Sequence, residues 1–357
     1  MRILLIVLLI VGLGFFTNDK PSKIRTISKV EIEHLVIDST LNVRALELID
    51  TVGIAYLTSN GKLGAMMRQE FDFSEEINNA FPVQIENDSF QLNFRALAMT
   101  KKNCYGITIG SPALLYSLDV DIKKNKIVYR EDDSKAFYDS MDFWNDEEGI
   151  AIGDPTGDCM SIIITRDGGN SWNKLSCDVL PKANEGEAAF AASDTNIAIV
   201  GDRTWVATGG KTSRILYSPD KGRTWEAFDT PIIQGKETTD MYSIDFYDEK
   251  NGFAIGGDYT KADDKIANKI RTKDGGKTWE VVADGQGPGY RSCVQYIPNS
   301  DGKELVAIGF KGIDYSSDAG ETWKHLSDEG YYTIRILNDS IAYAAGNRRI
   351  SKLTFSE

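Results

Sequence analysis

Short apolar runs, many of them ending in glycine and separated by polar turns, recur along most of the chain. Residues 141–154 read as a strand, a polar turn and a second apolar strand, and residues 244–257 repeat this pattern closely. Weaker copies begin at Val52, Cys104, Asn196, Leu305 and Ile341. Short strands and turns at regular spacing are typical of an all-β repeat fold.

A second repeat has the pattern [S/T]-x-D-x-G-x-[S/T]-W and recurs about every 50 residues. We expect each Asp to accept backbone N–H bonds within a hairpin turn and each Gly to supply a positive φ. Each Trp would then cover apolar surface of the sheet. The residues given this structural role are Asp167, Trp172, Asp220, Trp225, Asp274, Trp279, Asp318 and Trp323.

Seven such units can be aligned on their first strands. The aligned column contains Arg44, Arg95, Asp139, Ala188, Tyr242, Arg291 and Thr333. The spacing is near the ~40–50 residues of a four-stranded blade, which predicts a seven-bladed β-propeller of antiparallel blades over residues 28–357. The segment 28–37 precedes the first unit as an extra strand, and its pairing with 350–355 would complete the last blade and close the ring. Six or eight blades are the alternatives.

These motifs resemble the Asp-box (bacterial neuraminidase repeat) propellers. The arrangement of strand, turn, glycine-ended strand and box is most similar to photosystem II stability and assembly factor-like proteins. The resemblance covers residues 28–357 and implies the fold. It says little about function, because sialidases, receptors and assembly factors share these repeats.

The first residues read as a targeting segment. Arg2 precedes an apolar run from Ile3 to Phe16, which would span about 21 Å as a helix, less than the ~30 Å core of a bilayer. We therefore expect a signal peptide over residues 1–17 and an exported protein, periplasmic or extracellular. An uncleaved membrane anchor is the alternative, because the run offers a poor cleavage site.

Export makes the four cysteines informative. Cys159 and Cys177 are placed symmetrically about Gly168 in a predicted turn, so strands on either side would bring the two sulfurs together. We predict a disulfide there. Cys104 and Cys293 lie in apolar segments and read as buried thiols.

The chain carries a net charge of −13. Such a surface repels phosphate backbones, so nucleic-acid binding is not expected. With no CxxC and only two His, the sequence offers no metal site, and no glycine-rich dinucleotide fingerprint indicates a cofactor. Asp154 and Asp158 have a spacing that calcium could use but lack a full set of ligands.

The column residues are expected to surround the opening of the propeller. Convergent Arg44, Arg95 and Arg291 would suit a carboxylate from a sugar acid, a chain terminus or an acidic side chain. Alternatively, each arginine pairs with Asp139, Glu187 or a backbone carbonyl and only closes the ring. The predicted ligand-binding residues are Arg44, Arg95, Asp139, Glu187, Trp205, Tyr242, Tyr259 and Arg291. Trp205 is placed in a loop, where it either stacks on a ligand or packs between blades.

Together these features predict that the protein is a monomeric, non-enzymatic scaffold that binds or assembles an envelope protein or binds a glycan. The main alternative is a sialidase-like glycoside hydrolase, for which the three arginines with Tyr242, Glu187 and Asp139 supply the residue types. The sequence lacks the Arg-Ile-Pro motif that this resemblance requires. A lesser alternative is an oxidoreductase with an unrecognised cofactor.

Overall fold

The computed structural model describes residues 25–67, 79–119, 121–190 and 192–357. The segment 1–17, expected to be a signal peptide, lies outside these residues. The described chain is almost entirely β, with two single-turn helices, η1 (Ile122–Lys124) and η2 (Tyr259–Lys261). No helix within it is long and apolar enough to cross a membrane.

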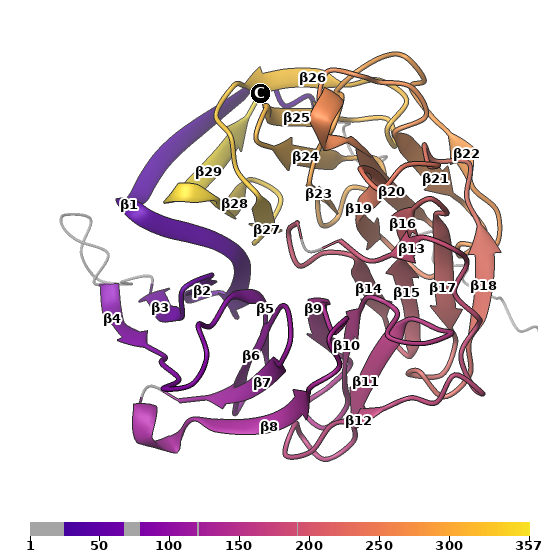
Figure 1. The fold of residues 1–357 in the computed structure, drawn as a ribbon. Coiled ribbons are helices and arrows are strands. Elements are labelled where there is room, and N and C mark those ends of the chain that lie inside the picture. The colour runs from indigo at the N-terminus through magenta and orange to yellow at the C-terminus, as the bar shows by residue number, and fades with distance from the viewer. Residues whose placement is uncertain (1–24, 68–78, 120, 191) are drawn as a thin grey trace, which may run out of the picture.

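Antiparallel sheets lie around a common centre, and the chain visits them in sequence order (Figure 1). One sheet contains β5 (Phe94–Met99), β6 (Cys104–Thr108), β7 (Ala113–Leu118) and β8 (Lys126–Glu131). The next contains β9 (Tyr138–Phe143), β10 (Gly149–Gly153), β11 (Ser161–Thr165) and β12 (Asn173–Lys174). A third contains β14 (Ile197–Val200), β15 (Arg203–Ala207), β17 (Arg214–Ser218) and β18 (Glu226–Asp229), and beside it β13 (Glu187–Ala188) pairs with β16 (Gly209–Gly210).

Two further four-stranded sheets complete this part of the chain. One contains β19 (Thr239–Phe246), β20 (Gly252–Asp258), β21 (Lys269–Thr272) and β22 (Glu280–Val281). The other contains β23 (Cys293–Tyr296), β24 (Leu305–Gly309), β25 (Gly312–Ser316) and β26 (Lys324–Ser327).

The two ends of the described chain meet in a seven-stranded sheet. Its order is β27 (Thr333–Ile336), β28 (Ile341–Ala345), β29 (Asn347–Ser356), β1 (Lys29–Ile49), β2 (Gly53–Thr58), β3 (Lys62–Met67) and β4 (Asn79–Gln84). The first half of β1 pairs with β29 and the second half with β2. In Figure 1 this indigo strand runs beside the yellow β29 and then bends toward the centre. β1 therefore covers the edge strand β29 of the group β27–β29 and the edge strand β2 of the group β2–β4, and joins the two groups into one sheet.

The four repeated segments form nearly identical hairpin turns. In the first, Asp167 Oδ1 accepts the Ser171 N–H at 2.9 Å and Oδ2 accepts the Ser171 hydroxyl, while Thr165 Oγ1 accepts the Gly169 N–H. The same contacts recur at Asp220, Asp274 and Asp318. The central glycine has a positive φ in each turn. These carboxylates stabilise the turns, because their oxygens accept hydrogen bonds from the neighbouring backbone N–H and hydroxyl groups.

The third four-stranded sheet departs from the sequence prediction. Residues 196–202 were expected to form a second strand, but β14 is the first strand of its sheet and turns into β15 through Gly201, whose φ is 61°. Ala188 therefore does not lie in the aligned column. Just before β14, the Asp194 carboxylate accepts N–H bonds from Leu97 in β5 and Met141 in β9, and so ties this segment to two other sheets.

Candidate functional site

The innermost strands carry irregularities at the aligned column. Strands β1, β5, β9, β14, β19, β23 and β27 contact one another in turn around the centre. Pairing shifts mark β-bulges at Arg44, Arg95, Asp139 and Tyr242, in β1, β5, β9 and β19. A bulge re-aims one side chain out of the regular alternation and is frequent beside functional sites. Four of the seven predicted column residues thus lie at corresponding bulges.

Arg44 is held from two sides without an acidic partner. Its Nη1 donates to the Ala192 carbonyl at 2.9 Å, and its guanidinium lies 4.0 Å above the Tyr332 ring. Its Nε is buried with no hydrogen bond, and among the described residues no Asp or Glu forms an ion pair with it. Burial lowers the pKa of Arg44.

Arg95 resembles Arg44 in having no ion-pair partner among the described residues. Its Nε is also buried without a hydrogen bond, and the described part of the chain places no acidic side chain in an ion pair with it. Burial, and then the neighbouring charge of Arg44, lowers its pKa to about 10, while Asp139 acts in the opposite direction. Two adjacent, poorly solvated cations would be stabilised by an anion placed between them.

The structure does not bring Arg291 and Glu187 into this site. Arg291 is buried and forms an ion pair with Asp314, with an Nη2–Oδ2 distance of 2.6 Å and both side chains 5% exposed. Glu187 is also buried and pairs with Arg214 at 2.7 Å. Each charge is thus already neutralised within the fold, as in the alternative in which such residues only close the ring, and ligand binding by Arg291 and Glu187 stays a prediction.

Trp205 is not a loop residue and cannot meet a ligand. It lies in β15 with no exposed surface, stacked on Phe246 at a ring distance of 3.7 Å. Its Nε1 donates to the Gly275 carbonyl. The loop assignment followed from the mistaken strand order of this sheet, and the alternative of packing between sheets is the one observed.

The two predicted tyrosines occupy different environments. Tyr242 is buried at its bulge, where its hydroxyl donates to the Thr238 carbonyl and its ring packs at 4.8 Å against Tyr290. Tyr259 is 47% exposed in η2, at a ring distance of 6.4 Å from Tyr242. Asp139 is buried at the remaining bulge, close enough to raise the pKa of Arg95.

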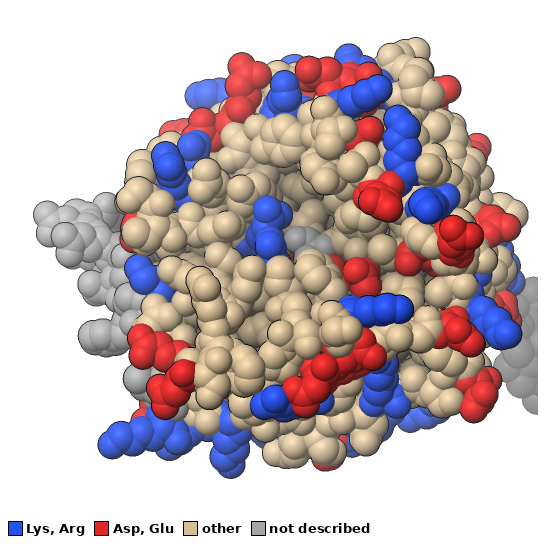
Figure 2. Space-filling model, viewed as in Figure 1, with Lys and Arg blue, Asp and Glu red and all other residues tan. Residues whose placement is uncertain are grey.

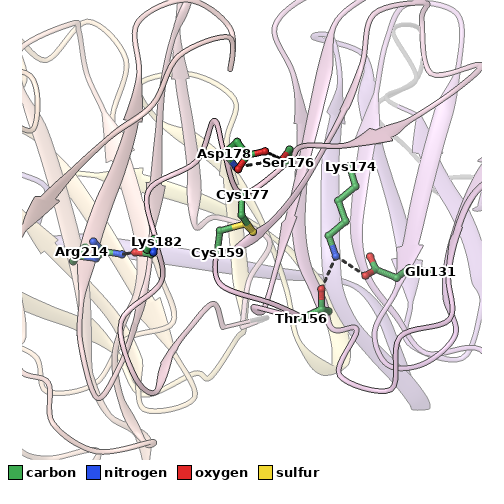
Figure 3. The surroundings of a disulfide bond; sticks show 9 residues. All are labelled: Glu131, Thr156, Cys159, Lys174, Ser176, Cys177, Asp178, Lys182 and Arg214. Atoms are coloured by element: carbon green, nitrogen blue, oxygen red, sulfur yellow. Dashed lines mark hydrogen bonds and ion pairs between the residues drawn. A yellow bond between two sulfur atoms is a disulfide. The ribbon is translucent and has the colours of Figure 1, made fainter.

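A disulfide joins Cys159 and Cys177 (Figure 3). It lies next to a polar cleft of about 610 Å³ between the β10–β11 loop and residues 182–188. Asp154 lines this cleft and accepts the Ala189 N–H, and burial raises its pKa to about 6. Figure 3 also shows Arg214 bonded to the Lys182 carbonyl, which ties this loop to the neighbouring sheet.

Among the described residues, neither the cleft beside the disulfide nor the central opening presents a set of side chains that could hold a metal ion. No group of three or more His, Cys, Asp or Glu side chains in the described ranges could hold such an ion. Cys104 and Cys293 are free thiols, and burial raises the pKa of Cys104 to about 12. A thiol with so high a pKa is a poor nucleophile and a poor ligand.

Figure 2 shows one face of the molecule, viewed as in Figure 1. Basic side chains lie near its middle on one side of a hollow, acidic side chains lie on the other side of it, and both kinds occur around the periphery. Basic side chains within a protein of net charge −13 can attract an anionic group locally while the overall charge repels it.

Comparison with solved structures assigns the fold to the β-propellers. YCF48 bound to D1 peptide superposes with a TM-score of 0.62 at 13% identity, over 93% of this chain and 98% of that one. YCF48 from Cyanidioschyzon merolae gives 0.62 at 12% identity over 92% and 99%, and the WD40 repeats of RRP9 give 0.60 at 10% over 92% and 97%. No protein-family profile and no curated protein sequence matches the chain.

Sequence reasoning missed two contributors to the opening. Tyr290 and Tyr332 each directly precede a column residue, Arg291 and Thr333. The Tyr332 ring lies under Arg44, and Tyr290 packs against Tyr242. A tyrosine immediately before the aligned position in two consecutive units was the signal that could have identified them.

Proposed function

We propose that this protein is an exported, non-enzymatic scaffold that binds a polypeptide partner at the central opening of a seven-bladed propeller. A carboxylate of the partner would lie between Arg44 and Arg95. The pairing of β1 with both β29 and β2 supports closure of the ring by the N-terminal strand. The apolar run at residues 3–16 supports export.

The proposed binding site rests on one observation. Arg44 and Arg95 lie together at corresponding bulges, partly buried and without ion pairs to any described acidic residue. The third arginine of the column behaves differently, since Arg291 is neutralised by Asp314. A protein that keeps two neighbouring, partly buried cations without ion pairs gains stability when an anion binds beside them.

The fold comparison favours a polypeptide as the source of this anion. YCF48, whose propeller superposes along nearly the whole chain, was solved with a peptide bound. Glycoside hydrolysis is less well supported, because Glu187 and Arg291 are both engaged in buried ion pairs. The hydrolase alternative would need these two residues free at the opening.

Affinity capture from the native cell envelope tests the proposal. The wild type is compared with Arg44→Gln/Arg95→Gln and with Lys123→Gln/Lys126→Gln, a control that removes the same charge from exposed positions. We expect polypeptides that are retained by the wild type and the control and lost from the arginine variant. The same polypeptides on all three proteins, or none on any, would contradict the proposed function.

A further inference from the structure

Five aromatic side chains form a connected group around Tyr242 and Tyr290. Tyr242 packs at a ring distance of 4.8 Å on Tyr290, and Tyr290 lies 5.3 Å from Phe310. Tyr242 also contacts Phe190 at 5.3 Å and Tyr259 at 6.4 Å. We name this set of five rings the aromatic lane.

The aromatic lane begins beside the unpaired arginines. Ala192, whose carbonyl accepts the Arg44 hydrogen bond, packs in one buried cluster with Tyr242 and Tyr290. Tyr290 also lies close enough to Arg44 to influence its pKa. The buried inner rings of the lane therefore pack beside Arg44, and its two exposed rings lie one ring contact further out.

The far end of the lane is open to solvent. Tyr259 is 47% exposed in the connection between β20 and β21, and Phe310 is 44% exposed in the turn between β24 and β25 of another sheet. Both connections are well held: Asp258 caps η2 by accepting the Thr260 N–H, and the Tyr331 N–H donates to the Gly309 carbonyl just before Phe310. Rigid, half-exposed aromatic rings next to a buried polar site are characteristic of binding hot spots.

We propose that the aromatic lane binds apolar side chains of the same polypeptide whose carboxylate occupies Arg44 and Arg95. The ligand is then a segment in which an acidic group is followed or preceded by aromatic or aliphatic residues. The ring of Tyr259 lies 6.4 Å from Tyr242 and that of Phe310 lies 5.3 Å from Tyr290, and an extended chain advances ~3.3 Å per residue. Apolar residues a few positions from the carboxylate would therefore meet these two rings. This inference rests on the proposed function and adds a sequence preference to it.

Selection from a displayed library of random peptides tests the preference. One arm of the library has free carboxyl termini and the other has random internal segments, so the source of the carboxylate is also determined. Enriched peptides are then titrated by fluorescence anisotropy against the wild type, Arg44→Gln/Arg95→Gln and Tyr259→Ser/Phe310→Ser. The matched control is Ile37→Ser/Ile127→Ser, which removes exposed apolar side chains from strands β1 and β8.

We expect enriched sequences that pair an acidic group with apolar residues. Loss of the two exposed rings should weaken their binding about tenfold or more, as at other aromatic hot spots, and the control should bind like the wild type. Enriched acidic peptides that need the arginines but bind the Tyr259→Ser/Phe310→Ser protein unchanged would overturn the lane and leave the proposed function intact. A selection that yields no enriched sequence, or sequences insensitive to the arginines, would overturn both.

Discussion

Replacing Arg95 by methionine should stabilise the folded protein. In the folded state the pKa of Arg95 falls from its ordinary 12.5 to about 10, chiefly through burial. Since 1.36 kcal/mol corresponds to one pKa unit, the charged side chain costs the folded state about 3 kcal/mol relative to the solvated, unfolded chain. Contact with solvent at the opening and the lost hydrogen-bonding capacity reduce this figure, so we expect a net gain of about 1–2 kcal/mol.

The same substitution at Arg291 provides the matched comparison. Arg291→Met would leave Asp314 buried without its guanidinium partner, and of the described side chains only His325 would remain to bond its carboxylate, at 3.0 Å. Removing one member of a buried ion pair typically costs about 3–5 kcal/mol, and we expect a loss near the lower end of that range. The two variants thus share a chemical change and should differ in sign.

Urea denaturation at pH 7, followed by tryptophan fluorescence, measures both effects. The account predicts a higher midpoint for Arg95→Met and a lower midpoint for Arg291→Met. If Arg95→Met were destabilised by 1 kcal/mol or more, about as expected for an arginine that closes the ring, the reasoning that Arg95 is kept for a ligand would be refuted.

Three further variants test other parts of the structure. Burial, and then Glu47, raises the pKa of Asp142 to about 7, so the folded state keeps a proton that the unfolded chain releases near pH 4. Stability should therefore fall as the pH rises from about 4 to about 7, and Asp142→Asn should flatten this dependence in denaturation curves. Cys159→Ser/Cys177→Ser opens a disulfide loop with a sequence separation of 18 residues and should lower the free energy of unfolding by about 3 kcal/mol. Cys104→Ser breaks no disulfide and should lower it by less, and equal losses in thermal melts would argue against the disulfide. Asp274→Ala removes acceptors of the Thr278 N–H and hydroxyl and should cost about 1–3 kcal/mol, while substitution of the exposed neighbour Lys273 should be neutral.

The parts of the fold that sequence predicted are those determined by local chemistry. The turns at Asp167 and its three counterparts depend on contacts within five residues, so their pattern is visible in the chain. The column containing Arg44, Arg95, Asp139 and Tyr242 was also found, because bulges at equivalent positions leave the strand spacing nearly constant.

The sequence-based predictions failed where the structure depends on contacts between residues that are far apart in the chain. An apolar strand reads the same whether it is first or second in its sheet, so β14 was misplaced and Trp205 with it. The partner of Arg291 is Asp314 on β25, and no local signal reveals that pairing. Whether an arginine is free or neutralised is a property of the assembled ring, and the sequence could only offer both readings.

The most direct measurement is the structure of the protein with its most strongly retained polypeptide bound. The account predicts a carboxylate of that polypeptide within hydrogen-bonding distance of both the Arg44 and Arg95 guanidinium groups. A polypeptide bound elsewhere, for example along the outer strands or on the turns of the four repeated segments, with the two arginines uncontacted, would contradict it.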